Sequence, residues 1–143
     1  TGLTQVGIRN VSSTAKEGYD AARAMGSDIV SVRQSRALGA EALAARIPNG
    51  TPVYVTIDID AFCPSIAAGT GTPSHGGFLY YDVLELLQHV AKSHMIIGID
   101  LVEVAPDYDS SGSTQILVAQ ILLNFLGFIF QAQVSEGLTK SAK

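Results

Sequence analysis

The chain has 143 residues, of which 47% are hydrophobic and 15% are charged. This composition excludes an intrinsically disordered chain, which needs low hydrophobicity and high charge, and the length suits a single domain. The net charge of −4 predicts no basic surface for nucleic acid. The single cysteine, Cys63, excludes an internal disulfide and a multi-cysteine metal site within one chain.

The predicted elements alternate strands with helices along the chain. The expected strands are 5–9, 28–32, 53–57 and 95–104. The expected helices are 16–25, with Ser12 and Ser13 as candidate caps, 39–47, 80–92 and 113–131. The strands lack inside-outside alternation, which is typical of strands that are covered on both faces. The sequence therefore predicts an α/β fold with a parallel sheet between helices.

The most apolar stretch runs from Ile116 to Phe130 and is interrupted by Gln120 and Asn124. It is shorter than the roughly 20 residues that span a bilayer, so we expect a buried core helix, covered on most of its sides. No signal-peptide pattern opens the sequence, and we expect a cytoplasmic protein without a membrane partner.

Two aspartates, Asp58 and Asp60, follow the apolar strand 53–57, at the end of a strand where parallel sheets bind ligands. Residues two apart point to the same side of a strand, with Cα atoms roughly 6.5 Å apart. Two carboxylates placed in this way repel each other, and a divalent cation such as magnesium, calcium or manganese removes that cost. The alternative is that both aspartates cap the following loop. The spacing alone leaves both interpretations open.

A second acidic pair lies in the expected strand 95–104. Glu103 sits among apolar residues near the strand end, where its carboxylate could hold a guanidinium group of a substrate by two hydrogen bonds. The alternative is a structural ion pair with one of the arginines. Asp100 lies within the apolar run, and we expect it to accept hydrogen bonds from a loop backbone or from a group of the site.

The glycine-rich segment 68–77 is not a phosphate-binding loop, because it lacks both the G-K-[ST] ending and the GxGxxG spacing. We expect it to turn tightly and to bring the chain near the aspartates. His89 and His94 are expected at the surface, and His75 either lines a pocket or faces solvent. Cys63 is expected to be a small buried side chain rather than a nucleophile.

Several motifs together resemble the ureohydrolase family of arginases, agmatinases and their relatives. TIDIDAFCP at 56–64 and AGTGTPSHGG at 68–77 resemble the family pattern [ST]-x-D-x-D-x-x-D-P…P-G-T-G-T-P-x-x-G-G. GIDLVEVAP at 98–106 is similar to G-x-D-x-V-E-V-x-P, and QVGIR at 5–9 is similar to an I-G-I-R strand of the family. The resemblance extends over most of the chain, from about Gln5 to Phe130.

The resemblance implies a three-layer α/β/α sandwich with a mostly parallel sheet, in which 1–133 is the C-terminal portion of the domain and 134–143 is a polar tail. It also implies manganese-dependent hydrolysis of a guanidino compound to urea and an amine, with two Mn²⁺ ions that activate water. Asp58 and Asp60 would be metal ligands and Glu103 would bind the guanidinium. The partners would be a small guanidino substrate and further copies of the chain in a homo-oligomer.

Two departures from the family pattern limit this interpretation. Cys63 stands where the family has a third Asp, and Ala68 stands where it has Pro. More seriously, the G-G-D-H and D-A-H-x-D segments that supply the remaining metal ligands have no counterpart before Val53. Two carboxylates cannot form a two-metal site alone, so the chain resembles the C-terminal half of a ureohydrolase. A non-catalytic structural subunit and an inactive fragment are the alternatives.

The expected substrate class follows from two short segments. FLYY at 78–81 and LVEVAP at 101–106 resemble agmatinase-like and guanidino-acid hydrolases more than arginases. The resemblance therefore favours agmatine or a related guanidino compound as the substrate.

Overall fold

The computed structural model describes residues 2–9 and 15–141, in which strands alternate with helices in the predicted order. The strands are β1 (Leu3–Ile8), β2 (Ser27–Ser31), β3 (Val53–Asp58) and β4 (Ile96–Val102). The helices are α1 (Lys16–Ala24), α2 (Val32–Leu38), α3 (Ala40–Ala44), α4 (Tyr80–Ser93) and α5 (Ser113–Ser141). Two short 3₁₀ turns, η1 (Ile59–Ala61) and η2 (Pro106–Tyr108), follow β3 and β4. The candidate caps Ser12 and Ser13 lie outside the described residues.

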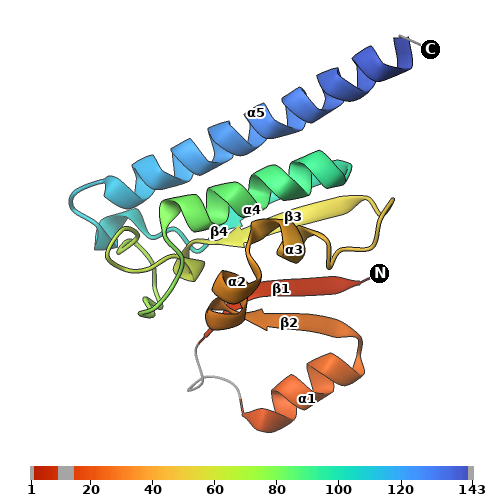
Figure 1. Cartoon of the computed structure of the whole chain (residues 1–143). Helices are drawn as coiled ribbons and strands as arrows, with labels where there is room; N and C mark the ends of the chain where they lie inside the picture. Colours follow the sequence, from red (N-terminus) through yellow and green to blue (C-terminus); the bar gives the residue numbers. More distant parts are fainter. Residues whose placement is uncertain (1, 10–14, 142–143) are drawn as a thin grey trace.

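The strands form two parallel pairs, β1 with β2 and β3 with β4, which confirms the predicted α/β class with parallel strands. Figure 1 shows that all four strands run toward the same side of the molecule. The glycine-rich loop and the segment after β4 gather on that side (Figure 1). The carboxyl ends of the strands, where ligand sites lie in parallel sheets, therefore meet the longest loop of the chain.

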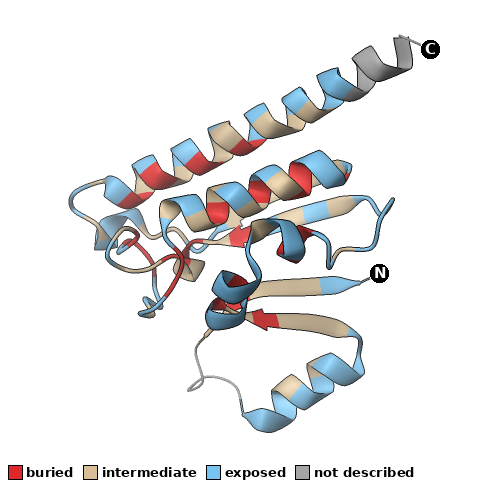
Figure 2. Ribbon diagram, in the orientation of Figure 1, coloured by how far each residue is buried: buried red, intermediate tan, exposed pale blue. Residues whose placement is uncertain are grey.

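One face of the β3–β4 pair shares a hydrophobic core with α4, and α5 packs against both α4 and β4. Val55, Ile57 and Ile99 alternate with outward-facing residues and belong to the hydrophobic core or pack against it. The opposite face carries Tyr54 and Ile97, which are exposed. Within the described residues, helices therefore cover one face of this pair, although the apolar strand pattern predicts cover on both (Figure 2).

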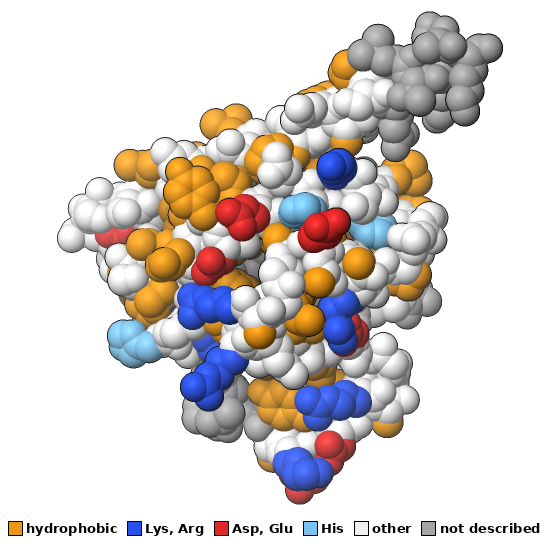
Figure 3. Space-filling model, viewed as in Figure 1, with side chains coloured by type: hydrophobic (Ala, Val, Ile, Leu, Met, Phe, Trp, Pro, Cys, Tyr) orange, Lys and Arg blue, Asp and Glu red, His pale blue; other side chains and the backbone are white. Residues whose placement is uncertain are grey.

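The long helix α5 is likewise covered on one side only, contrary to the expectation of cover on most sides. Ile121 and Phe125 are fully buried against the core, whereas Leu123 and Phe130 are more than half exposed. Figure 3 shows apolar side chains along α5 at the upper border of the molecule, with most charged side chains lower down. Residues Ser113–Ser135 are long and apolar enough to cross a membrane by length and composition, with a mean hydropathy of 1.7 and 22% of the window buried.

Three helices differ from the expectations. The sequence analysis missed α2, which begins with a capping box in which Gln34 N donates to Ser31 Oγ and Ser31 N donates to Gln34 Oε1. The S-x-x-Q spacing is the sequence pattern that could have found it. The helix expected at 39–47 is shorter, Ala40–Ala44. Helix α5 continues to Ser141, into the segment expected to be a polar tail.

Gly77, the last residue of the glycine-rich segment 68–77, lies close to the backbone of residues 61–63. Phe78 N donates to Ala61 O and Cys63 N donates to Phe78 O, both at 2.9 Å, so the segments 61–63 and 77–78 are hydrogen-bonded side by side. A Cβ atom added at Gly77 would lie 2.5 Å from the backbone carbon of Phe62 and 2.6 Å from its oxygen. No side chain fits at this position without displacing backbone.

We expect Gly77→Ala to lower the free energy of unfolding by about 1–3 kcal/mol, because the added methyl group meets backbone atoms that cannot rotate away. Gly71→Ala is the matched control in the same loop, since nothing lies within 4 Å of the position of its Cβ. Urea unfolding of both variants measures the difference. Equal unfolding midpoints would contradict the close approach at Gly77.

We expect Phe125→Ala to lower the free energy of unfolding by about 3–5 kcal/mol, because it removes a fully buried aromatic side chain. Leu123→Ala on the same helix serves as the control, and it should change the stability by less than about 0.5 kcal/mol because Leu123 is 69% exposed. A large loss in Leu123→Ala would mean that the outer face of α5 is covered in solution.

Candidate metal and guanidinium site

The pairing of β3 with β4 brings the predicted site residues together. Asp58, the last residue of β3, lies opposite Val102, the last residue of β4, in the parallel register. Asp60 follows in η1 and Glu103 follows β4 directly. The three carboxylates thus share one end of the sheet, although Glu103 is 45 residues from Asp58 and 43 residues from Asp60 in the sequence.

The structure places Asp60 differently from the expectation that both aspartates point to the same side of one strand. The strand ends at Asp58, and Asp60 belongs to the 3₁₀ turn η1. Asp58 Oδ1 accepts a hydrogen bond from Asp60 N at 2.9 Å, which caps this turn. The capping alternative is therefore confirmed for one oxygen of Asp58.

The remaining carboxylate oxygens are less occupied. Asp60 Oδ2 accepts a hydrogen bond from Thr72 Oγ1 of the glycine-rich loop at 3.1 Å. Within the described residues, Asp58 Oδ2 and Asp60 Oδ1 accept no hydrogen bond. Capping and binding of a cation are therefore compatible here, because each carboxylate keeps one oxygen without a hydrogen-bond donor.

The electrostatics of Asp58 indicate a site with excess negative charge. Partial burial raises the pKa of Asp58, the hydrogen bond from Asp60 N lowers it, and the negative charges of Asp60 and Glu103 raise it further. The positive charge of Arg9 acts in the opposite direction and is the smallest of these causes. A cation beside Asp58 would remove both the burial cost and the repulsion, which is the chemistry of a carboxylate donor set.

Glu103 combines exposure with an unusual backbone conformation. It is exposed, and its φ of 64° makes it the one residue other than glycine with a positive φ in the described part of the chain. Such a conformation costs free energy and is often retained at functional sites. The alternative of a structural ion pair is not realised, since none of the salt bridges among the described residues includes Glu103.

Asp100 has partners other than those expected. Among the residues that the structure describes, it binds no loop backbone; its carboxylate accepts hydrogen bonds from Tyr54 Oη at 2.9 Å and from Thr56 Oγ1. Thr56 is its register partner on β3, so the three side chains lie together on the uncovered face of the β3–β4 pair. The hydrogen bond to Asp100 is the main cause that raises the pKa of Tyr54.

Asp109 and Thr114 also belong to segments that fit the family pattern, but the sequence analysis did not assign them their role of holding the glycine-rich loop. Gly69 N donates to Thr114 Oγ1 at 2.9 Å, and Thr114 Oγ1 donates to Asp109 Oδ2 at 2.7 Å. Asp109 Oδ2 also accepts from Thr114 N at the start of α5. The hydrogen bond from Ser111 Oγ to Asp109 Oδ1, followed by those from Thr114, holds the pKa of Asp109 well below its usual range. The D-x-x-x-x-T spacing before the apolar run is the only sequence pattern that marked this network.

The histidine and cysteine expectations are corrected in part. His94 is buried rather than at the surface, because it ends α4 against α3, where its Nε2 lies 3.2 Å from Ala44 O. His89 is half-buried and His75 is exposed. Cys63 is half-buried rather than buried, and hydrogen bonds with Ser65 are the main cause that lowers its pKa.

The described residues contain no group of three or more His, Cys, Asp or Glu side chains that could hold a metal ion. Asp58 and Asp60 therefore have the oxygen chemistry and the negative charge that a hard cation prefers, but they supply only part of a ligand set. A complete site requires ligands from a further polypeptide segment or chain.

Comparison with known proteins identifies the group to which these features belong. The family described as the Arginase family matches residues 1–127. Guanidinobutyrase of Pseudomonas aeruginosa is 35% identical over 127 residues, which are 87% of this chain and 39% of that protein. Agmatinase of Chromobacterium violaceum is 42% identical over 87 residues, which are 61% of this chain and 27% of that protein.

A solved structure gives the same result in three dimensions. Proclavaminate amidinohydrolase from Streptomyces clavuligerus matches with a TM-score of 0.81 and 37% identity, over 90% of this chain and 43% of that chain. The chain thus spans about two fifths of the length of such relatives (39% and 43%). This likeness confirms the predicted fold class.

We expect Asp58→Asn to raise the free energy of unfolding of the metal-free chain at pH 7. The folded-state pKa of Asp58 lies above its ordinary value of 3.8, so ionisation opposes folding once the pH rises through the folded-state pKa. The gain should disappear as the pH falls below the ordinary value of 3.8, because the carboxyl group then becomes protonated in both the folded and the unfolded state. Thermal unfolding with a chelator present measures it.

The exposed Asp107→Asn serves as the control for removal of one negative charge. A lower stability of Asp58→Asn at pH 7 would contradict the prediction, because it would mean that the ionised carboxylate stabilises the folded chain through its capping hydrogen bond.

Proposed function

Since this chain belongs to the arginase family, we propose that it is part of a ureohydrolase that cleaves a guanidino compound to urea and an amine. The observation that supports this proposal is the meeting of Asp58, Asp60 and Glu103 at the carboxyl ends of β3 and β4. These residues occupy the strand ends where parallel sheets bind their ligands. They also belong to the segments that resemble the family pattern.

Asp58 and Asp60 serve as carboxylate ligands of manganese in this proposal. Each has an oxygen that accepts no hydrogen bond within the described residues, and the negative charges around Asp58 favour a cation. Bound manganese supplies the activation of a water molecule for attack on a guanidinium carbon. The other ligands come from a segment or chain beyond these 143 residues.

Glu103 binds the guanidinium of the substrate. Its carboxylate is exposed and lies near enough to Asp58 to raise the pKa of that residue. A carboxylate meets a planar guanidinium with two parallel hydrogen bonds, which fixes the orientation of the group as well as its position. The left-handed backbone conformation of Glu103 ends the extended conformation of β4 directly after Val102.

The substrate we propose is agmatine or a related guanidino compound. The similar proteins include a guanidinobutyrase, an agmatinase and a proclavaminate amidinohydrolase, whose substrates share the guanidino group and differ in the rest of the molecule. The guanidino group is the part that Glu103 would bind, and the remainder of the substrate would meet residues outside this chain. We also propose a homo-oligomer, which the exposed apolar face of α5 supports.

We expect urea release from a chimera in which this chain replaces the 122-residue segment that it matches in the Streptomyces clavuligerus enzyme. Asp58→Asn and Asp60→Asn should each lower kcat/KM by about 100-fold or more, because a metal ligand contributes more than its outer partners do. Glu103→Gln should lower kcat/KM by about 30-fold or more, chiefly through KM. Urea release is measured with manganese over a panel of guanidino compounds.

Asp107→Asn in the chimera controls for the loss of one exposed carboxylate. A chimera that unfolds cooperatively and binds manganese but releases no urea from any compound would favour the non-catalytic alternative. Unchanged turnover in Asp58→Asn or Asp60→Asn would refute the ligand role of that residue.

A further inference from the structure

Arg9 links the two parallel strand pairs at the candidate site. It follows β1, a strand of one pair. Its guanidinium donates to the carbonyl oxygens of Asp60 and Ser74, which follow β3, a strand of the other pair. The distances to Ser74 O are 3.2 Å from Nε and 2.8 Å from an Nη atom. Among the described residues, no backbone pairing joins β1 to β3. The hydrogen bonds of Arg9 therefore connect the end of β1 directly to the segment that follows β3.

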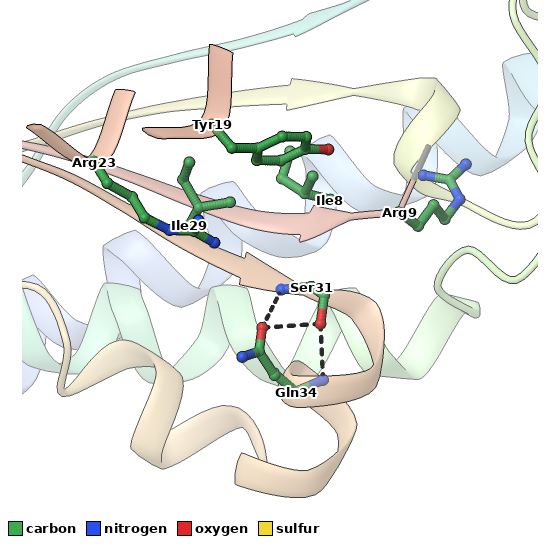
Figure 4. Close-up of a pocket in the computed structure, with 7 residues that line it drawn as sticks. All are labelled: Ile8, Arg9, Tyr19, Arg23, Ile29, Ser31 and Gln34. Carbon is green, nitrogen blue, oxygen red and sulfur yellow. Dashed lines mark hydrogen bonds between the residues drawn. The ribbon is translucent and has the colours of Figure 1, made fainter. Parts of the chain in front are cut away.

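The guanidinium of Arg9 binds this loop, while its side chain also borders a nearby hollow. A shallow pocket between α1 and the ends of β1 and β2 is lined by Ile8, Arg9, Tyr19, Arg23, Ile29, Ser31 and Gln34. Figure 4 shows the guanidinium of Arg9 at the edge of this pocket, turned away from Arg23 and toward the ribbon that follows β3. The geometry therefore assigns Arg9 to the carboxylate site rather than to a ligand of the pocket.

The two carbonyl groups that Arg9 binds belong to segments with little support of their own. Asp60 lies in a three-residue 3₁₀ turn, and Ser74 lies in the glycine-rich loop without regular structure. Backbone carbonyls in such segments need partners, and a planar guanidinium with five donors can bind two of them in a fixed arrangement. Thr72 Oγ1 of the same loop donates to Asp60 Oδ2, so a shift of the loop would also move this carboxylate contact.

We propose that Arg9 is a positioning residue of the carboxylate site: by holding the carbonyl oxygens of Asp60 and Ser74 together, it fixes the turn that carries the carboxylates of Asp58 and Asp60. This inference rests on the proposed function, because it assigns Arg9 to manganese binding by those carboxylates. Arg9 itself contacts no reacting group, and its effect passes through the backbone of the turn.

Arg36 provides a matched control within the same fold. It donates to Gly77 O at 2.9 Å and to Asp82 Oδ2 at 3.3 Å, so it also anchors the glycine-rich loop through a backbone carbonyl. Its contact with Gly77 lies where residues 77–78 pair with residues 61–63, and its hydrogen bonds go to neither Asp60 O nor Ser74 O. Removal of Arg36 therefore loosens the loop without removing the hydrogen bond that fixes the turn after β3.

The first test uses amide hydrogen exchange of the 143-residue chain. The amides of Asp60 and Phe62, which donate to Asp58 Oδ1 and Ile59 O, report on the turn. Arg9→Ala should speed their exchange by about tenfold or more while the amides in the middle of α4 keep their rates. Arg36→Ala should leave the amide of Asp60 within about twofold of the wild type, because the hydrogen bonds of Arg36 do not include Asp60. Uniform acceleration across the chain in Arg9→Ala would overturn the proposal in favour of a general structural role.

The second test measures the manganese concentration that gives half-maximal urea release in the chimera. Arg9→Ala should raise this manganese concentration by about tenfold, which is the usual effect of removing a residue that orients metal ligands without binding the metal itself. Arg9→Lys should recover part of the loss, because an ammonium group can reach one of the two carbonyls but cannot hold both in one plane. Arg36→Ala should stay within about twofold of the wild type.

The outcomes separate the two proposals. Equal manganese requirements in Arg9→Ala and the wild-type chimera would overturn the positioning role while urea release still supports the proposed function. If the wild-type chimera releases no urea, the proposed function fails. The role of Arg9 is then decided by two other measurements, the affinity for manganese determined by calorimetry and the rates of amide exchange.

Discussion

The site depends on the in-register parallel pairing of β3 with β4. Because both strands run in the same direction and end at the paired residues Asp58 and Val102, the acidic residues that follow them are forced to one end of the sheet. The core holds this register through alternate apolar residues that pack beneath α4. Repulsion among the carboxylates of Asp58, Asp60 and Glu103 opposes this arrangement. The apolar area that the pair buries on the side of α4 offsets this repulsion.

The same pairing explains which surfaces remain uncovered. The core lies on the side of α4 and α5, so the opposite face of the β3–β4 pair exposes Tyr54 and Ile97, and the outer side of α5 exposes Leu123 and Phe130. Parallel strands in α/β proteins are ordinarily covered on both faces. Within the described residues the β3–β4 pair departs from this arrangement, and the chain spans 43% of the solved proclavaminate amidinohydrolase chain.

Several local features at the site favour function over stability. The left-handed backbone of Glu103 and the partly buried carboxylate of Asp58 each cost folding free energy. Their neighbours compensate for this cost by hydrogen bonds that fix the loops: Arg9 to the turn after β3, Arg36 to Gly77, and Thr114 to Gly69. The glycine-rich loop is thus anchored at three separate points, one near each of its ends and one beside Asp60. Rigid support of this kind limits the movement of groups that must meet a ligand in a fixed geometry.

Apolar runs and family motifs are local patterns, so the amino-acid sequence was sufficient to predict the α/β class, the order of the strands and the acidic residues of the site. The three-dimensional structure was needed to place Asp60 in a turn, to show that His94 is buried and to show that Arg9 binds the carbonyls of Asp60 and Ser74. Those contacts join residues 50 to 65 positions apart, as for His94 with Ala44 and Arg9 with Ser74. Their geometry is set by packing between elements, which the periodicity of any single segment does not encode.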